Sequence, residues 1–418
     1  MSTLLLPAGQ HGDVRVIEGS RLLADLADGP GLVAHRRRSG ASNRWPHSGN
    51  DLATLLESID LRGRGGAGFP FARKLRTALT ARGRRIVVVN AAEGEPASSK
   101  DSVLMIGSPH LVLDGAQIVA AALHATEIHV VVPGERAAVQ RAVAAAIAER
   151  ADADAVPMQL HQAECRFVAG ESSAVLELLA GRPNLPVTTS GPSAIKGLNG
   201  RPTVLSNAET YAQTALLVRD GLDAYYATGT RTEPGTRLFT VDGDGDRPTV
   251  LEVPHGTRVQ SVLAACDAET DTGVLLGGYH GTWLSPATVE GLTVSAPAMS
   301  AVGAAIGAGV LLPLREGTCP VRRTAAIVDY LAGETANRCG PCRFGLPALA
   351  GAMRDLALGV VHSDERIAQL ANAVEGRGAC HHPDGTTRAI RSLASAFPRE
   401  VEAHLAGRCS LADRVGAR

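Results

Sequence analysis

The chain has 418 residues, of which 45% are hydrophobic and 20% are charged. At about 150 residues per domain this length predicts roughly two to four domains, and the composition excludes a disordered polymer. The 41 Lys and Arg residues balance 42 Asp and Glu residues, for a formal net charge of −1. This balance excludes a general electrostatic attraction to nucleic acid, so we expect no nucleic-acid partner.

Two apolar segments are candidates for targeting or membrane signals. The N-terminal residues 1–10 have no basic flank and too short an apolar run for a signal peptide. The uncharged residues 295–314 are nominally long enough to span a bilayer but are rich in Ala, Gly, Ser and Pro, so we interpret them as a buried strand or loop. Seven cysteines without a secretory signal do not predict a disulfide framework. We expect a cytoplasmic protein, and association with the inner face of a membrane through a partner stays open.

Residues 1–230 are expected to form an α/β domain. The first 50 residues look irregular, and their basic tract at 35–38 is interpreted as a solvated loop. Thereafter strands made of continuous β-branched residues alternate with helical patterns, which is typical of a sheet covered on both faces. The predicted elements are helices at 51–61, 72–82 and 135–150 and strands at 86–89 and 129–132.

Residues 231–315 are predicted to form a small β-grasp module of the SLBB type. Short strands at 238–241 and 250–253 flank a turn of alternating Asp and Gly, which is a hairpin signal. A helix at 258–265 and Gly-rich strands near 273–278 follow.

Residues 316–418 are predicted to form a small helical bundle with cysteines in its loops. Leu346, Leu349, Met353 and Leu356 share one helical face, and Asp364 is a candidate N-cap for the next helix. Helices at 387–397 and 399–405 complete the bundle.

The most unusual segment is the glycine-rich stretch at 62–70, which we call the glycine loop. Gly63, Gly65 and Gly68 satisfy G-x-G-x-x-G, but a helical pattern precedes them where a dinucleotide fingerprint requires a strand. Glycines still let backbone N–H groups approach a phosphate, and Lys74 adds a positive charge. The loop therefore predicts a phosphate-bearing ligand.

With the glycine loop and the blocks that follow it, the sequence resembles the family of NADH-binding flavoprotein subunits of respiratory complex I. This family also occurs in NAD-linked hydrogenases and formate dehydrogenases. The resemblance extends in order from about residue 55 to 395. The matching blocks are residues 61–70, Asn90-Ala-Ala-Glu-Gly-Glu-Pro, Gly170-Glu171, Asn207-Ala-Glu-Thr, the β-grasp segment and the C-terminal cysteines.

The resemblance implies an FMN cofactor and NAD(P)H as substrate. It places catalytic roles on Glu95 and Glu171 and a site for the dinucleotide near Phe69, Glu95 and Arg201. The residues that it implies around the flavin are Gly63, Arg64, Gly65, Gly66, Lys74, Asn90, Glu93, Gly170, Glu171, Asn207 and Thr210.

The sequence departs from the family pattern at several positions, among them Arg201, where the family typically has Lys. The family has Asp at 92, Glu at 172 and Tyr at 167, where this chain has Ala92, Ser172 and Phe167. Two carboxylates and a hydroxyl are thus missing near the expected flavin, and such groups tune a flavin's reduction potential. In the cysteine motif the family has Cys where Ala336 stands.

The motif Cys339-Gly-Pro-Cys342 has three interpretations. It matches a thioredoxin dithiol, but a helical segment precedes it instead of a strand. With Cys380 and His381 or His382 it could form a Cys₃His zinc site. In the family it contributes to an iron–sulfur cluster, for which Cys339, Cys342 and Cys380 match three of four ligands.

With Ala336 in the first position, a four-iron cluster could take its fourth ligand from Cys319, Asn337, His381 or His382. A three-iron cluster is the other form that the resemblance leaves open. Cys165, Cys266 and Cys409 lack such neighbours in the sequence and are interpreted as core or surface residues.

The preferred hypothesis is an electron-transfer oxidoreductase subunit. It would pass electrons from NAD(P)H through FMN and an iron–sulfur cluster to an iron–sulfur, ferredoxin-like partner, and membership of a membrane-attached complex stays open. Two alternatives remain. One is a non-catalytic relay or assembly paralogue that has lost hydride transfer, and the other is a zinc-stabilised interaction protein.

Overall fold

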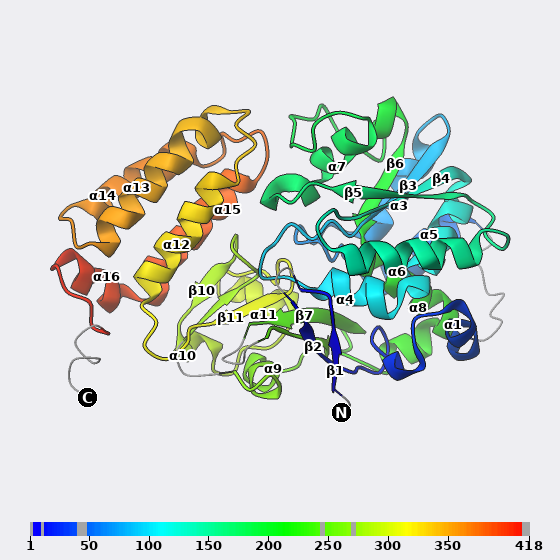
Figure 1. The fold of residues 1–418 in the computed structure, drawn as a ribbon, viewed down its shortest axis with the longest axis horizontal. Coiled ribbons are helices and arrows are strands. Elements are labelled where there is room, and N and C mark those ends of the chain that lie inside the picture. The colour runs from blue at the N-terminus through cyan, green and yellow to red at the C-terminus, as the bar shows by residue number, and fades with distance from the viewer. Residues whose placement is uncertain (1–2, 10–11, 40–47, 243–246, 269–272, 412–418) are drawn as a thin grey trace.

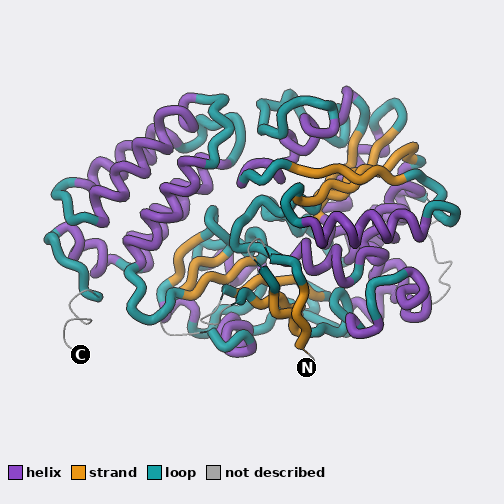
Figure 2. Tube along the Cα trace, viewed as in Figure 1, coloured by secondary structure: helices purple, strands orange, loops and turns teal. Residues whose placement is uncertain are grey.

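The computed structural model describes the chain except residues 1–2, 10–11, 40–47, 243–246, 269–272 and 412–418. It is a mixed α/β fold that contains two separate sheets and a group of C-terminal helices (Figure 1). Strands gather in two places, and the C-terminal helices lie to one side of both (Figure 2).

The first sheet is parallel and has the strand order β5-β4-β3-β6. Its β-branched strands are buried on both faces, as their sequences predict. One face packs on α3, α5, α6 and α8, with α2 behind α3 and α5, and the other face packs on α7 and its flanking turns. The strands are β3 (Arg85–Asn90), β4 (Ala125–Pro133), β5 (Met158–Ala163) and β6 (Thr203–Asn207). The helices of this unit are α1 (Leu32–Ser39), α2 (Gly49–Ser58), α3 (Phe71–Thr80), α4 (Lys100–Gly107), α5 (Pro109–Leu123), α6 (Ala137–Arg150), α7 (Ser172–Leu179) and α8 (Ala208–Tyr226), with 3₁₀ turns at Leu26–Asp28, Phe167–Gly170 and Leu198–Gly200.

The second sheet is mixed, with the order β1-β2-β8-β7-β11-β9-β10. The predicted hairpin is present as β7 and β8, which pair antiparallel, while its turn at 243–246 lies outside the described residues. The strands are β1 (Thr3–Leu6), β2 (Val14–Ile17), β7 (Thr236–Val241), β8 (Thr249–Pro254), β9 (Val274–Leu276), β10 (Thr282–Leu284) and β11 (Val310–Pro313). Its short helices are α9 (Val259–Ala265), α10 (Pro286–Val289) and α11 (Ala296–Ala301).

The N-terminal strands extend this second sheet, because β2 pairs in parallel with β8. Strands β1 and β2 therefore share a sheet with the segment predicted as 231–315, and the expected boundary at residue 230 does not follow sheet membership. A short strand such as β2, whose partner β8 is far away in the sequence, carries no local signal of that pairing.

The C-terminal helices pack around their own apolar core, which includes the predicted stripe of Leu346, Leu349, Met353 and Leu356. A single π-helical turn, Pro341–Gly345, precedes α13. The helices are α12 (Pro320–Gly333), α13 (Leu346–Ala357), α14 (Ser363–Val374), α15 (His382–Ala396) and α16 (Pro398–Leu405).

Three local predictions were wrong. The basic tract at 35–38 lies in helix α1, where His35 is buried beside Asp114, and not in a loop. Residues 295–314 contain a helix, α11, as well as the strand β11. Asp364 lies in the first turn of α14 instead of capping it, because the helix begins at Ser363 after a left-handed His362.

In the part of the chain that is described, no single helix has the length and apolarity needed to cross a membrane. Helices α4 and α5 are together long and apolar enough to do so, but they are joined by a 93° bend.

Candidate flavin and iron–sulfur site

The glycine loop folds back on itself immediately before α3. Arg62 and Pro70 form an antiparallel bridge, and the Gly63 amide donates to the Phe69 carbonyl over 2.9 Å. Gly66 and Gly68 have φ angles of +106° and +61°, which favour glycine. A Cβ atom added at either position would meet nothing within 4 Å. The loop therefore presents open backbone that a ligand can approach closely.

The loop touches the carboxyl edge of the parallel sheet. Strands β3 and β6 end in register at Asn90 and Asn207, and a Cβ on Gly65 would lie 3.2 Å from the Cβ of Asn207. The Asn90 amide donates to the Gly170 carbonyl over 2.8 Å. Ligands of open parallel sheets bind at this edge. The structure thus brings four of the predicted flavin residues together.

Lys74 is a buried cation beside this edge. Its Nζ donates to the Leu205 carbonyl over 2.6 Å, and burial lowers its pKa to about 8. Among the described residues no carboxylate forms an ion pair with it. A buried ammonium without a counterion favours an anionic ligand.

Arg64 contributes to this region through its backbone, whereas its side chain points toward the second sheet. Its amide donates to Thr210 Oγ1 over 3.0 Å. Its guanidinium lies 3.9 Å from Glu209 and 3.3 Å from His255 Nε2, beside a cavity of about 280 Å³. Burial and the nearby Arg64 lower the pKa of His255 to about 2. Arg64 therefore anchors the loop to the second sheet.

Glu93 is held by a dense set of hydrogen bonds. Its carboxylate accepts from Ser98 Oγ and the Asp101 amide over 2.8 Å each, and from the Ser102 amide over 3.0 Å. Arg136 forms an ion pair with it. These partners occupy the carboxylate, so Glu93 stabilises the segment 90–102 through contacts within the protein.

Glu95 lies where the α/β unit meets the second sheet. Its carboxylate accepts from the Tyr279 amide over 2.9 Å, and a Cβ on Gly278 would clash with it. Burial raises its pKa to about 7, against the lowering effect of the hydrogen bonds from Tyr279 and Ala97. The group can thus gain or lose a proton near neutral pH.

Glu171 caps the N-terminus of α7. Its Oε2 accepts from the amides of Ser173 and Ala174 over 2.8 and 3.2 Å. Glu171 directly follows Gly170. This cap therefore fixes the Gly170 carbonyl, which accepts the hydrogen bond from the side-chain amide of Asn90.

The two remaining predicted residues lie at different places. Phe69 is 44% exposed on the glycine loop, with the Arg73 guanidinium 5.7 Å from its ring centre. Arg201 binds the Arg84 carbonyl over 3.2 Å and forms an ion pair with Glu127. These partners lie where β3 and β4 begin, because Arg201 itself precedes β6. It is therefore at the opposite edge of the sheet from the glycine loop, and the structure does not join it to the other site residues.

The three predicted metal-binding cysteines lie close together. Cys339 and Cys342 flank the start of the π-helical turn, and Cys380 directly precedes the first turn of α15. Burial, together with the neighbouring thiols of Cys339 and Cys380, raises the pKa of Cys342 to about 12. Burial also raises the pKa of Cys380, as do Glu171 and Cys339. A cation bound between the three thiols would stabilise the thiolate forms that burial and proximity disfavour.

Of the candidate fourth ligands, two are committed elsewhere. His382 uses both ring nitrogens, Nδ1 with His280 at 3.0 Å and Nε2 with the Leu331 carbonyl at 2.8 Å. Cys319 groups with other side chains near the end of the chain. Asn337 remains close to Ala336 in sequence, and His381 has a 98% exposed side chain beside Cys380.

A group of aromatic rings lies where the α/β unit, the second sheet and the C-terminal helices meet, and the sequence did not predict it. The Phe167 ring centre lies 4.5 Å from that of His280, 5.4 Å from that of His382 and 6.4 Å from that of Tyr330. The Phe167 amide donates to Glu334 over 2.8 Å. These residues come from four distant segments, so no local pattern could have predicted their contact.

Comparison with known families and proteins gives a consistent result. Residues 56–215 match the Nuo51 FMN-binding domain, and residues 322–404 match the NADH-ubiquinone oxidoreductase-F iron–sulfur binding region. Together these matches cover more than half of the chain. The chain belongs to the family of NADH-binding flavoprotein subunits.

Similar proteins of known name agree with this assignment to the flavoprotein family. The NADH-quinone oxidoreductase F 2 subunit of Rhizobium meliloti is 26% identical over 408 residues, which are 93% of this chain and 96% of the relative. The NADH-quinone oxidoreductase F subunit of Mycobacterium tuberculosis is 29% identical, over 86% and 85% of the two chains. The NADP-reducing hydrogenase subunit HndC of Solidesulfovibrio fructosivorans is 26% identical, over 89% and 80%.

Among solved structures, a chain of an air-oxidized NAD⁺-reducing [NiFe]-hydrogenase superposes with a TM-score of 0.83 at 28% identity. The match covers 93% of this chain and 67% of that one. The mixed α/β architecture of this flavoprotein family member is therefore shared with it.

The residues of this chain fit both groups that the flavoprotein family implies. The open backbone at Gly66 and Gly68 and the unpaired ammonium of Lys74 suit the phosphate of FMN. The neighbouring thiols of Cys339, Cys342 and Cys380, of which Cys342 is buried and the other two are partly buried, suit iron, because soft sulfur ligands match it.

Proposed function

We propose that this chain oxidises NAD(P)H with FMN and passes the electrons one at a time to an iron–sulfur cluster and then to an iron–sulfur protein partner. FMN, when bound, accepts a hydride and can release its two electrons separately. The chain's own residues bind, orient and shield the reacting groups.

One observation carries this proposal most directly. Glu171, which caps α7 at the flavin edge of the sheet, is close enough to Cys380 to raise the pKa of its thiol. The proposed flavin edge and the three thiols therefore face each other across the contact between the α/β unit and the C-terminal helices, where α7 and α15 can be followed in Figure 1. Two redox groups held there would lie near enough for electron transfer.

Each proposed residue has a limited task. The glycine loop and Lys74 would bind the phosphate, and the side chain of Asn90 would orient the polar edge of the flavin. Asn207, whose side chain binds Asp101 and Lys100, would position the strand end beside it. The exposed ring of Phe69 offers a surface on which a base can stack. Glu95 would hold a proton near the reacting groups, since its pKa is about 7.

The relatives' printed names place them in NADH-quinone oxidoreductase and in a hydrogenase. By analogy we propose that this chain also works as a subunit beside an iron–sulfur partner. The three thiols would hold a four-iron cluster with a fourth ligand from His381 or Asn337, or a three-iron cluster.

The test is an anaerobic titration of the FMN- and iron-reconstituted full chain with NADH and with NADPH. We expect the flavin absorbance to bleach with one of the two nucleotides. Gly65→Val is the control, because its added side chain would press on Asn207 and close the flavin edge. A wild-type protein that retains FMN but does not bleach would contradict hydride transfer and favour a non-catalytic relay.

A further inference from the structure

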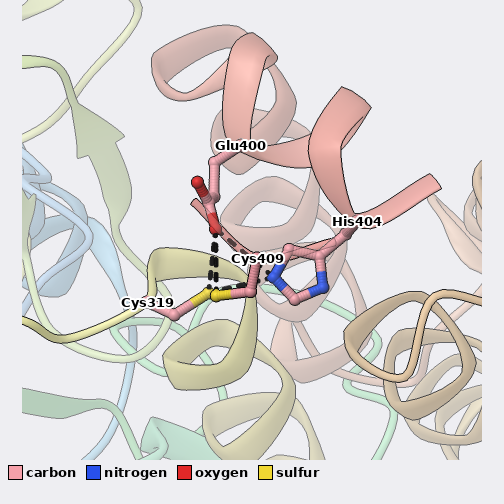
Figure 3. Close-up of side chains that lie close together, drawn as sticks. All are labelled: Cys319, Glu400, His404 and Cys409. Carbon is pink, nitrogen blue, oxygen red and sulfur yellow. Dashed lines mark hydrogen bonds and ion pairs between the residues drawn. The ribbon is translucent and has the colours of Figure 1, made fainter. Parts of the chain in front are cut away.

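Four buried side chains converge at the end of the C-terminal helices, away from the three thiols described above. Cys319 immediately precedes α12, Glu400 and His404 lie one turn apart on α16, and Cys409 follows that helix (Figure 3). Their exposed fractions are 8% or less. The contact between α12 and α16 brings them together from distant positions in the sequence.

The donor atoms of these side chains have the spacing of a metal site. Cys319 Sγ lies 3.2 Å from His404 Nε2 and 3.5 Å from Glu400 Oε1. Cys409 Sγ and His404 Nε2 lie 3.3 and 3.4 Å from Glu400 Oε1. All four donor atoms lie within 4.8 Å of one another. Around a tetrahedral zinc ion, with Zn–S of about 2.3 Å and Zn–N or Zn–O of about 2.0–2.2 Å, neighbouring ligand atoms lie roughly 3.3–3.8 Å apart.

We propose that Cys319, Glu400, His404 and Cys409 bind one structural zinc ion. Two thiolates and an imidazole select zinc over hard cations such as magnesium or calcium. Four protein ligands and deep burial leave no open position for water or substrate, which is typical of a structural site.

The surroundings of Glu400 support a ligand role. Its second oxygen accepts a hydrogen bond from Ser410 Oγ, which leaves Oε1 directed at the two sulfurs and the imidazole. Within the described residues no Lys or Arg pairs with this buried carboxylate. A cation between these groups would supply the missing positive charge.

The zinc ion would cross-link two parts of the chain that are distant in sequence. It would fix the start of α12 to α16 and to the segment after it. Helix α12 leads directly into the segment that carries Cys339 and Cys342. By holding the start of α12 against α16, the zinc ion would stabilise the helices that position these two iron ligands. Neither of the two family matches describes a zinc site.

The experiment measures zinc and iron together in the full chain, purified from zinc-supplemented cells and reconstituted anaerobically with iron. We expect about one zinc per chain in addition to iron, as a four-ligand structural site predicts. The double variant Cys319→Ser/Cys409→Ser should lose the zinc and keep the iron. The matched control Cys342→Ser should lose iron and keep the zinc.

A second readout covers the case in which the double variant does not fold. Zinc X-ray absorption of the wild-type chain should give two sulfur and two lighter ligands, and added Co²⁺ should give the thiolate-to-metal absorption of a tetrahedral site. Wild-type protein without zinc, zinc that is lost in Cys342→Ser but kept in the double variant, or a disulfide between Cys319 and Cys409 in the intact protein would each overturn the proposal.

Discussion

The charge of Lys74 is unfavourable in the folded chain without a ligand. Its ammonium is buried, donates to one backbone carbonyl, and has no carboxylate partner among the described residues. Burial lowers its pKa from 10.5 to about 8. In the folded chain without ligand, the positive charge of Lys74 therefore lowers the stability, and a bound phosphate would compensate this charge.

This environment predicts opposite effects of Lys74→Met on stability and on binding. The folded pKa lies below the unfolded value, so the penalty for the charge is complete below pH 8 and disappears as the pH rises from about 8 to 10.5. At pH 7 the FMN-free variant should be more stable than wild type, by up to about 3 kcal/mol. Its FMN affinity should fall by about 10- to 100-fold, because a charge-assisted hydrogen bond is lost.

Chemical denaturation of the FMN-free proteins between pH 7 and 10.5 checks the first effect, and fluorescence titration with FMN checks the second. Lys196→Met is the matched control, since Lys196 is exposed. A Lys74→Met protein that is less stable without FMN, yet binds it normally, would contradict this role.

At the residue scale, the sequence predicted which residues lie near one another better than it predicted which partners their side chains bind. It placed Gly65, Lys74, Asn90 and Asn207 in one site. The structure brings Gly65, Asn90 and Asn207 together, and Lys74 binds the carbonyl of Leu205, two residues before Asn207. It could not tell that the carboxylate of Glu93 is occupied by its own neighbours. Which atoms surround a side chain depends on contacts between distant segments, and motif spacing does not record them.

At the scale of single elements, the cysteine-bearing turn lacks one of the four cysteines of the family pattern. Ala336 is buried, and the Cys342 thiol accepts a hydrogen bond from its amide, so position 336 borders the thiols. A cysteine introduced there would add a sulfur at the position where the family has its first ligand.

We therefore expect Ala336→Cys to complete a four-iron cluster after anaerobic reconstitution. In the wild-type background His381→Ala should lower the iron retained per chain, whereas in the Ala336→Cys background it should have little effect. Iron analysis and EPR spectra of the four proteins measure this coupling. Equal losses from His381→Ala in both backgrounds would show that His381 does not replace the missing cysteine.

Elements with a strong apolar pattern were predicted well, and elements without one were not. The buried face of α13 and the strands β3 and β4 follow directly from their periodicity. Helix α1 was missed because its tract of arginines has almost no amphipathic pattern. Its stability comes from contacts with α5 and α6 and from the pairing of His35 with Asp114.

At the scale of the whole molecule, three parts of the chain meet beside the proposed redox groups. Glu95 of the α/β unit receives the amide of Tyr279 from the second sheet. Phe167 binds Glu334 at the end of α12 and packs on His382 of α15. The sequence predicted the kinds of units and their order. It could not predict this junction, because it is built from contacts between residues that lie far apart along the chain.

The proposed electron path is tested by rapid-freeze EPR. NADH, or whichever nucleotide reduces the flavin, is mixed anaerobically with the reconstituted chain. In wild type we expect the flavin to bleach first and a reduced iron–sulfur signal to follow. In Cys342→Ser the flavin should still bleach, but no such signal should appear. A wild-type chain whose flavin is reduced while its iron stays oxidised would contradict the claim that the glycine loop and the three thiols form one electron path.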